Sequence, residues 1–287
     1  MTEASLRRRS RPSRPFPSAA ALRWAVLIAV ASLVLVPLVA TVLGGFKSLG
    51  ELRVNPFGWP RDWDSSHYAG ILASPGYWQM MGNSLVIAGL TVLLTLVVSA
   101  MAAFAFAQLR FFGSAFLFNY LLLGLMFPAA TAILPLFIRI RDLGLLDSYW
   151  GVVLPQVAFG VTMSVLLMRN AFKQLPAELF EAARLDGCGY IGFFWRFVLP
   201  MSRPILATVA VVIFVQSWNA YLLPLMVTNR TELYPWPLGI MAYQGQYSTE
   251  WHLVLAYITL TILPAVLLFF AAQRHIVAGM TAGSVKG

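Results

Sequence analysis

Residues 24–46 read WAVLIAVASLVLVPLVATVLGGF, a run without a single charged side chain. A helix needs roughly 20 apolar residues to cross the hydrocarbon core of a bilayer, so this run is long enough to span a membrane. Its apolar core, from Val26 to Val42, is also longer than the roughly 7–15 residues of a signal-peptide core. We therefore expect an uncleaved first transmembrane helix.

Five further stretches share this length and composition. The six expected spans cover approximately residues 22–46, 83–107, 114–138, 149–169, 204–227 and 251–272. Hydrophobic residues make up 59% of the 287 residues and charged residues only 11%, whereas soluble domains carry roughly 25% charged residues. The sequence therefore predicts an all-α integral membrane protein with six transmembrane helices.

The basic residues predict the orientation of these spans. The net charge is +9, and five arginines lie in residues 1–21, ahead of the first span. With the N-terminus in the cytosol, 14 of the 20 Lys and Arg residues fall on the cytosolic side, as the positive-inside rule requires. An even number of spans then places both termini in the cytosol. We expect these residues to meet membrane lipid, and no nucleic acid, because they flank spans.

The largest expected cytosolic loop, residues 170–203, contains the signals of a short helix. Pro176 can occupy the first position of a helix. Glu178 and Glu181 follow in the first two turns, where negative charge complements the helix dipole. Gly187 then permits the sharp reversal that ends a helix. The loop therefore predicts a short helix that protrudes from the membrane.

A second short amphipathic segment, residues 191–198, follows, and we expect Leu199-Pro200 to end it. Pro204 is then placed to open the fifth span. From composition alone, the loop fits two interpretations equally well. It is either a knob that enters a groove of a cytosolic protein, or an amphipathic helix that lies on the lipid surface.

The loop resembles the EAA loop of ABC importer permeases, whose pattern is Glu-Ala-Ala, three residues, Gly, nine residues, Ile, one residue, Leu-Pro. The matching positions here are Glu181, Ala182, Ala183, Gly187, Leu199 and Pro200, with Phe197 at the place of the Ile. Asp186 and Trp195-Arg196 resemble the carbohydrate branch of that family. Residues 217–219 and 279–287 resemble the smaller permease of maltose-type sugar transporters.

The resemblance implies a permease subunit of an ATP-driven, binding-protein-dependent sugar importer in a bacterial plasma membrane. It covers roughly residues 80–287, and residues 22–287 would form one transmembrane domain with its core transport region at about 80–277 and a cytosolic tail at 274–287. The implied partners are a second permease subunit, two copies of an ATPase subunit and an extracytoplasmic sugar-binding protein. In the family the EAA loop is a coupling helix, seated in a cleft of the ATPase.

The resemblance also implies which residues meet the ATPase subunits. The coupling contact would use Glu181, Ala182, Ala183, Asp186, Gly187, Leu199 and Pro200. The end of the chain would reach between the two ATPase subunits with Gly283, Ser284, Val285, Lys286 and Gly287.

The sequence offers no energy source and no catalytic site of its own. It contains no Gly-x-x-x-x-Gly-Lys-Ser/Thr phosphate loop, and no nucleophile–base set that would make it an enzyme. We therefore expect no cofactor or metal on this chain, and ATP with Mg²⁺ on the partner ATPase subunits. A secondary carrier is the weaker alternative, because the spans lack the ionisable residues that ion coupling usually needs. An ABC permease for a non-sugar solute is a further alternative.

Four polar side chains are candidates for the substrate path, namely Asn83, Gln216, Trp218 and Asn219. An amide and an indole can serve the hydroxyls and the apolar face of a sugar. For Gln216, Trp218 and Asn219, the competing interpretation, which we favour, is that they hold helices together through hydrogen bonds, and Asn83 is a weaker path candidate. Aromatic residues in the two long outer loops, 47–82 and 228–250, fit an interfacial belt or a docking surface for an extracytoplasmic partner.

Overall fold

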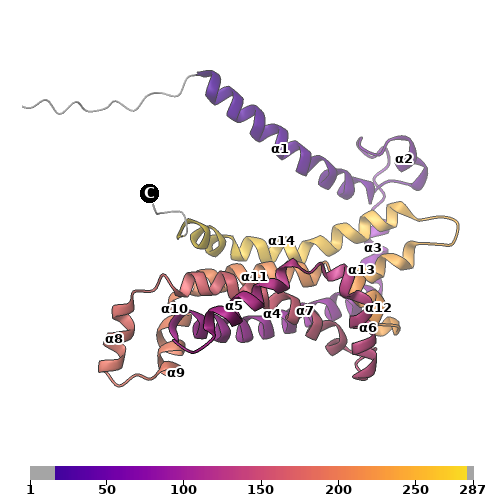
Figure 1. The fold of residues 1–287 in the computed structure, drawn as a ribbon. Coiled ribbons are helices and arrows are strands. Elements are labelled where there is room, and N and C mark those ends of the chain that lie inside the picture. The colour runs from indigo at the N-terminus through magenta and orange to yellow at the C-terminus, as the bar shows by residue number, and fades with distance from the viewer. Residues whose placement is uncertain (1–16, 283–287) are drawn as a thin grey trace, which may run out of the picture.

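The computed structural model describes residues 17–282 as a bundle of helices (Figure 1). Most of the expected basic tail, up to residue 16, and the expected ATPase-contacting residues 283–287 lie outside this range. Within it, the pairing of extended backbone is limited to one isolated bridge between Gln244 and Thr249. The predicted all-α class is confirmed.

Four helices in the described part of the chain are long and apolar enough to cross a membrane. They are α1 (Pro17–Gly44), α4 (Pro75–Gln108), α7 (Tyr149–Phe172) and α14 (Trp251–Ala282). Three of them contain a proline in the helix interior, at Pro37, Pro155 and Pro264. Membrane helices tolerate such prolines where neighbouring groups satisfy the freed carbonyls.

The third expected span, 114–138, is bent and is not one straight helix. Here α5 (Ser114–Leu123) and η1 (Gly124–Met126) meet η2 (Ala129–Ala132) and α6 (Ile133–Asp142) at 87°. The break falls at Phe127-Pro128, where both residues have extended backbone angles. A proline lacks the N–H that would continue the helix and pushes the preceding residue away from helical angles.

The segment that leads into the fifth span also differs from the prediction. Leu199-Pro200 does not end the second short segment, because α9 (Tyr190–Phe193), η3 (Phe194–Val198) and α10 (Leu199–Met201) continue through it. The turn η3 is π-helical, and the N–H of Leu199 donates to the carbonyl of Phe194. This wider turn relieves the clash that a proline ring makes with the preceding turn of an α-helix.

The fifth span itself begins after a 76° bend at Ser202. Helix α11 (Arg203–Trp218) carries Pro204 in its first turn, as predicted. It stops at Trp218, and α12 (Leu222–Val227) follows after a short interruption. The expected stretch 204–227 is therefore two helices. If each bent pair is counted as one span, the described residues hold up to six spans, in agreement with the predicted number.

The centre of the bundle is the pair α4 and α7, with α11 packed on α4 and α14 packed on α11 (Figure 1). Gly160 allows this close packing, because a Cβ there would lie 2.9 Å from Ile213 and 3.4 Å from Thr95. Small residues at helix contacts are typical of membrane bundles. Helix α1 contacts α14 and is otherwise exposed from residue 21 to residue 39.

The bundle has two distinct ends (Figure 1). One end carries the short helix α8 (Ala177–Leu185) and is called here the α8 end. The opposite end is called the α2 end, and it carries α2 (Leu49–Val54), α3 (Ser66–Ala73), η4 (Thr231–Leu233), α13 (Trp236–Gly239) and η5 (Ile240–Tyr243). In Figure 1 the first residues of α1 and the last residues of α14 point toward the side of the α8 end.

Candidate functional site

The short helix predicted in the loop 170–203 is present as α8. Pro176 precedes its first residue and acts as the N-cap with extended backbone angles, so it does not occupy the first helical position as expected. Gly187 ends the helix as predicted, with a φ of +75°. The N–H of Cys188 donates to the carbonyl of Ala183 at 2.8 Å, and the N–H of Gly187 donates to that of Arg184 at 3.0 Å. These two bonds form a Schellman motif.

One face of α8 packs onto the bundle through aromatic rings. The ring of Phe180 stacks on Tyr190 at 5.0 Å and meets Phe193 edge-on at 4.9 Å. Ala183, on the same face, is only 4% exposed and belongs to the core cluster that includes Phe172 and Phe193. Helices α8 and α9 therefore form one unit with the core.

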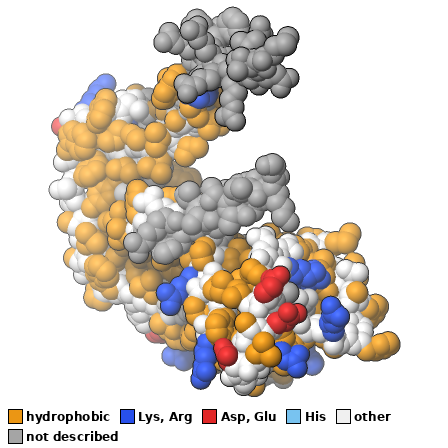
Figure 2. Space-filling model, turned by 90° about the vertical axis from the view of Figure 1, so that its left-hand side faces the viewer, with side chains coloured by type: hydrophobic (Ala, Val, Ile, Leu, Met, Phe, Trp, Pro, Cys, Tyr) orange, Lys and Arg blue, Asp and Glu red, His pale blue; other side chains and the backbone are white. Residues whose placement is uncertain are grey.

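The other face of α8 is exposed, together with the turn that follows. We call residues 177–189 the α8 knob. Glu181, Ala182, Asp186 and Gly187 are exposed on it, and Leu185 is 90% exposed. Figure 2 views the molecule from this side and shows charged side chains gathered in the lower part, at the height of α8 and α9. Four of the seven predicted coupling residues are therefore exposed on one protrusion, whereas the fifth on α8, Ala183, faces the core and is not free to meet another protein.

The other two predicted coupling residues, Leu199 and Pro200, lie in α10 next to the 76° bend. Leu199 packs against the core cluster and Pro200 is exposed. They therefore belong to the connection between the knob and α11.

The end of α7, which precedes the knob in the chain, contacts two other helices. The side chain of Gln108 donates to the carbonyl of Phe172 at 3.0 Å, which joins the end of α4 to the end of α7. The Arg169 guanidinium donates to the carbonyl of Phe106 at 3.2 Å and lies 3.8 Å from the ring centroid of Phe118 on α5. The end of α7, from which the chain leads into the knob, is therefore joined to both α4 and α5.

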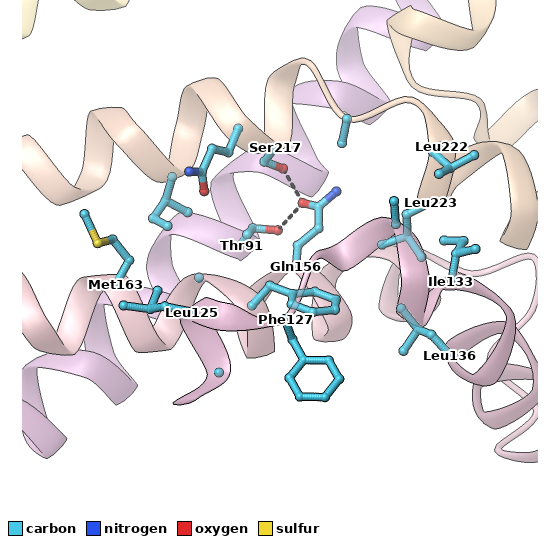
Figure 3. A pocket seen from close by; sticks show the side chains of 17 residues that line it. Thr91, Leu125, Phe127, Ile133, Leu136, Gln156, Met163, Ser217, Leu222 and Leu223 are labelled. Atoms are coloured by element: carbon cyan, nitrogen blue, oxygen red, sulfur yellow. Dashed lines mark hydrogen bonds between the residues drawn. The ribbon is translucent and has the colours of Figure 1, made fainter. Parts of the chain in front are cut away.

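A cavity of about 530 Å³ lies between α4, α7, α11 and the bend of the third span (Figure 3). Its volume is in the range of small-molecule pockets. None of the 17 described residues that line it carries a charge. They are Thr91, Gly124, Leu125, Phe127, Ala130, Ile133, Leu136, Gln156, Phe159, Gly160, Met163, Ile213, Gln216, Ser217, Ala220, Leu222 and Leu223.

A polar cluster lies on one wall of this cavity. The Gln156 Oε1 atom accepts hydrogen bonds from the hydroxyl of Thr91 at 3.1 Å and from that of Ser217 at 2.5 Å. The Gln156 nitrogen points away from both hydroxyls (Figure 3) and has no hydrogen-bond partner among the described residues. The carboxamide of Gln216 is exposed at the same cavity.

Of the four predicted path residues, only Gln216 lines the cavity. Trp218 is 2% exposed, and its indole donates to the carbonyl of Thr261 at 3.2 Å. The Asn83 amide donates to the carbonyls of residues 232 and 234 and accepts from the Tyr149 hydroxyl. Asn219 donates to a carbonyl of its own helix. These contacts agree with the helix-packing interpretation of Trp218, and they give Asn83 the same role.

The sequence analysis missed several residues that line the cavity, among them Thr91, Phe127 and Phe159. The available signal was Pro128, which interrupts the third span and opens the backbone beside the cavity. An apolar run that contains a proline can mark a broken helix, and broken helices often border solute sites in transporters.

At the α2 end, a charged side chain is fully buried. Lys47 is 0% exposed, and its Nζ donates to the carbonyls of Asn55 at 2.7 Å, Pro56 at 3.3 Å and Gly58 at 2.7 Å. Buried charges are found where hydrogen bonds compensate the loss of water. Lys47 therefore fixes the loop after α2 against the end of α1.

A second contact at this end joins two connecting segments. The carboxylate of Asp147 accepts from the backbone N–H groups of Asn229 at 2.5 Å and Arg230 at 3.0 Å. These two hydrogen bonds hold the pKa of Asp147 below its ordinary value, because they stabilise the charged form. The segment between α6 and α7 is thereby joined to the segment after α12.

The membrane-crossing helices, the protruding α8 knob and the uncharged cavity define the class of this protein as a multi-pass membrane transport protein. Comparison with known proteins gives the family. Residues 95–282 match the model described as binding-protein-dependent transport system inner membrane component, and the chain belongs to this family.

Two relatives illustrate the similarity. The chain is 31% identical over 264 residues to the probable ABC transporter permease protein YurM of Bacillus subtilis, covering 92% of this chain and 88% of that protein. It is 34% identical over 273 residues to the arabinooligosaccharides transport system permease protein AraQ of Halalkalibacterium halodurans, covering 93% and 97%.

A solved structure has the same fold. It is a bacterial ABC transporter involved in the import of the acidic polysaccharide alginate, and its matching chain superposes with a TM-score of 0.80 at 22% sequence identity. The match covers 93% of this chain and 99% of that chain. The arrangement of helices described above is therefore the fold of a chain of this transporter.

Proposed function

We propose that this chain is the permease subunit of an ATP-driven, binding-protein-dependent sugar importer in a bacterial plasma membrane. The observation that carries the proposal is the α8 knob, a short helix with one exposed face and one face fastened to the bundle core. Such a protrusion is suited to receive force from a separate protein and to pass it to the membrane helices.

The α8 end faces the cytosol in this proposal, and both termini lie on that side. In support, the exposed basic residues Lys173, Arg184, Arg196 and Arg203 gather near the knob, as the positive-inside rule favours for cytosolic loops. Two copies of an ATPase subunit then bind on this side. One of them receives the exposed residues Glu181, Ala182, Asp186 and Gly187, while residues 283–287 reach between the two copies.

ATP and Mg²⁺ bind to the ATPase subunits, and this chain binds no cofactor. When the ATPase pair closes, the α8 knob moves with it as a rigid body, and the long helices reorient so that the cavity changes the side it faces. A second permease subunit completes the pathway. A loaded binding protein at the α2 end favours the ATP-competent state, because coupling between two sites is reciprocal.

A sugar is the solute that the relatives favour. The arabinooligosaccharide permease named above covers nearly the whole chain, and a 31% identical relative from Streptomyces coelicolor is named as a diacetylchitobiose uptake permease. The cavity agrees with a sugar, because its described lining combines carboxamides and hydroxyls with aromatic rings and lacks charge.

The test is transport by the purified complex in proteoliposomes. The chain is co-expressed with its partner permease and ATPase subunits, and the binding protein is added outside. We expect uptake of labelled oligosaccharides only with ATP and Mg²⁺ inside and binding protein outside. Uptake by this chain alone in ATP-free vesicles would contradict the proposal and would favour a secondary carrier.

A further inference from the structure

We infer that the cavity at the bend of the third span is a contact site for an uncharged sugar unit, held by the carboxamides of Gln156 and Gln216. This inference rests on the proposed function, since it assigns the solute of that importer to particular residues of this subunit. It is independent of the α8 knob, which lies at the end of the bundle.

The hydrogen bonds of Gln156 leave one half of its carboxamide unused. Two hydroxyls, of Thr91 and Ser217, both bond to the Oε1 atom, and the nitrogen is buried without a partner among the described residues. A buried amide group without a partner is unfavourable, and native proteins almost always satisfy such groups. Gln156 therefore has unused hydrogen-bonding capacity beside the cavity, which a polar ligand can satisfy.

The unpartnered amide group of Gln156 is best satisfied by a ligand with hydroxyl groups. A hydroxyl both donates and accepts, so a sugar satisfies the amide of Gln156 whichever of its two polar atoms faces the cavity. The nitrogen is covered in this structure, so contact requires the side chain to turn toward the cavity. A sugar hydroxyl can then replace the bond from Thr91 or Ser217 that such a turn breaks.

Gln216 supplies a second carboxamide from a different helix. It lies on α11, whereas Gln156 lies on α7, and its side chain is exposed at the cavity. The remaining surface is apolar and includes the rings of Phe127 and Phe159. A few polar groups on an apolar and aromatic wall are typical of small-molecule sites, and they match a sugar ring with its polar rim and apolar faces.

The absence of charge among the described lining residues defines the class of sugar. A uronate, phosphate or amino acid zwitterion would enter a site with no opposite charge to pair with. Moving an unpaired charge from water into such a site is strongly unfavourable. The cavity therefore selects neutral sugars over acidic ones.

The test uses the complete complex in proteoliposomes and two substitutions that keep side-chain length, Gln156→Met and Gln216→Met. The matched control is Gln246→Met, at an exposed glutamine in the loop before α14 that does not line the cavity. The readout is the amount of sugar imported per ATP hydrolysed, with binding protein saturating. The panel holds labelled neutral oligosaccharides of arabinose, glucose and N-acetylglucosamine, and galacturonate oligomers as acidic members.

We expect the binding protein to stimulate ATP hydrolysis in both cavity variants as in the wild type, because the α8 knob is unchanged. Sugar imported per ATP falls roughly tenfold in each, the size of one lost neutral hydrogen bond, and Gln246→Met behaves as the wild type. Only neutral members of the panel are carried.

Unchanged import per ATP in both cavity variants overturns the inference, and so does equal transport of galacturonate oligomers by the wild type. If Gln156→Met does not assemble, Gln216→Met decides, because its exposed side chain is not part of the Thr91–Gln156–Ser217 cluster. Failure of the proposed function has a different signature, since the wild-type complex would then import no sugar at all.

Discussion

The ring of Phe180 on the exposed helix α8 packs edge-on against the buried ring of Phe193, with 4.9 Å between centroids and 66° between planes. Phe193 is 1% exposed and belongs to the core cluster that holds Met168 of α7 and Val209 of α11. This aromatic contact therefore lies between the exposed knob and two of the helices that border the cavity.

The first prediction is that Phe180→Ala separates ATP hydrolysis from transport. The exposed face of α8 is unchanged, so the ATPase still binds and hydrolyses ATP. The knob loses its aromatic contact and moves without driving the bundle, so uptake falls at least fivefold, about one kcal/mol of lost coupling. The measurement compares uptake with ATPase activity in the same proteoliposomes.

The control for this prediction is Phe116→Ala on α5, where the ring is 71% exposed. It removes the same side chain without touching the core cluster, and uptake should stay at the wild-type level. Retention of full uptake in Phe180→Ala would show that force passes into the bundle by another route.

The second prediction concerns the backbone at Gly187. Its φ of +75° is left-handed, and a Cβ added there would meet no atom of this chain within 4 Å, so within this chain the cost of a side chain is backbone strain alone. Asn adopts this conformation far more readily than a β-branched residue. We expect Gly187→Asn to keep the ATPase subunits bound during purification and Gly187→Val to lose most of them.

The two Gly187 variants are compared by the ratio of ATPase to permease in the purified complex. Both insert into the membrane, because the span sequences are unchanged. If the Gly187→Asn and Gly187→Val complexes retain equal amounts of ATPase, the left-handed backbone at residue 187 is not needed for the contact between the permease and the ATPase.

The positions of the spans could be predicted from the sequence, because each is an uncharged run of sufficient length. The end of α8 was also predictable, since a glycine after an amphipathic segment is a strong local signal. The 87° bend at Phe127-Pro128 was not predictable. A proline breaks the hydrogen-bonding pattern locally, but the direction of the following helix depends on α7 and α11, which are distant in sequence.

The roles of polar side chains were harder to predict for the same reason. Trp218 and Gln216 are two residues apart, yet one lies in a core cluster and the other at the cavity. Whether a side chain on α11 points into the core or into the cavity depends on which helices pack around α11. Lys47 begins an expected solvent-exposed loop and is fully buried, because three carbonyls of that loop fold over it.

The third prediction follows from the burial of Lys47. Replacement by Met removes three hydrogen bonds from a charged donor and leaves the carbonyls of Asn55, Pro56 and Gly58 without this partner. Hydrogen bonds to charged groups contribute about 1.5–3 kcal/mol each, and the loss is partly offset by the removed cost of burying the charge. We expect a net destabilisation of about 2 kcal/mol, measured by thermal unfolding in detergent.

The control for Lys47 is Arg53→Met, an exposed basic residue at the end of α2. It changes the net charge by the same amount, so its unfolding midpoint should match that of the wild type. Equal midpoints for Lys47→Met and the wild type would show that the carbonyl contacts do not stabilise the α2 end.

The fourth prediction is a pH dependence at Asp147, whose ordinary pKa near 3.8 is lowered by the N–H groups of Asn229 and Arg230. A lowered pKa in the folded state means that the contact stabilises the protein at pH values above the ordinary pKa, and that this contribution is lost as the pH falls through the lowered pKa.

The substitution Asp147→Asn tests this dependence. It keeps the shape of the side chain and tolerates the positive φ of 52°, but it removes the charge. The variant should unfold at a lower temperature than the wild type near neutral pH, and the gap should shrink as the pH falls below the ordinary pKa of 3.8 and through the lowered pKa of Asp147. Thermal midpoints in detergent at about pH 7, 5 and 3 measure this gap, with the exposed Asp62→Asn as the control. A gap that stays constant down to the lowest pH would assign the effect of the substitution to geometry, because a charge effect must disappear once the wild-type carboxylate is protonated.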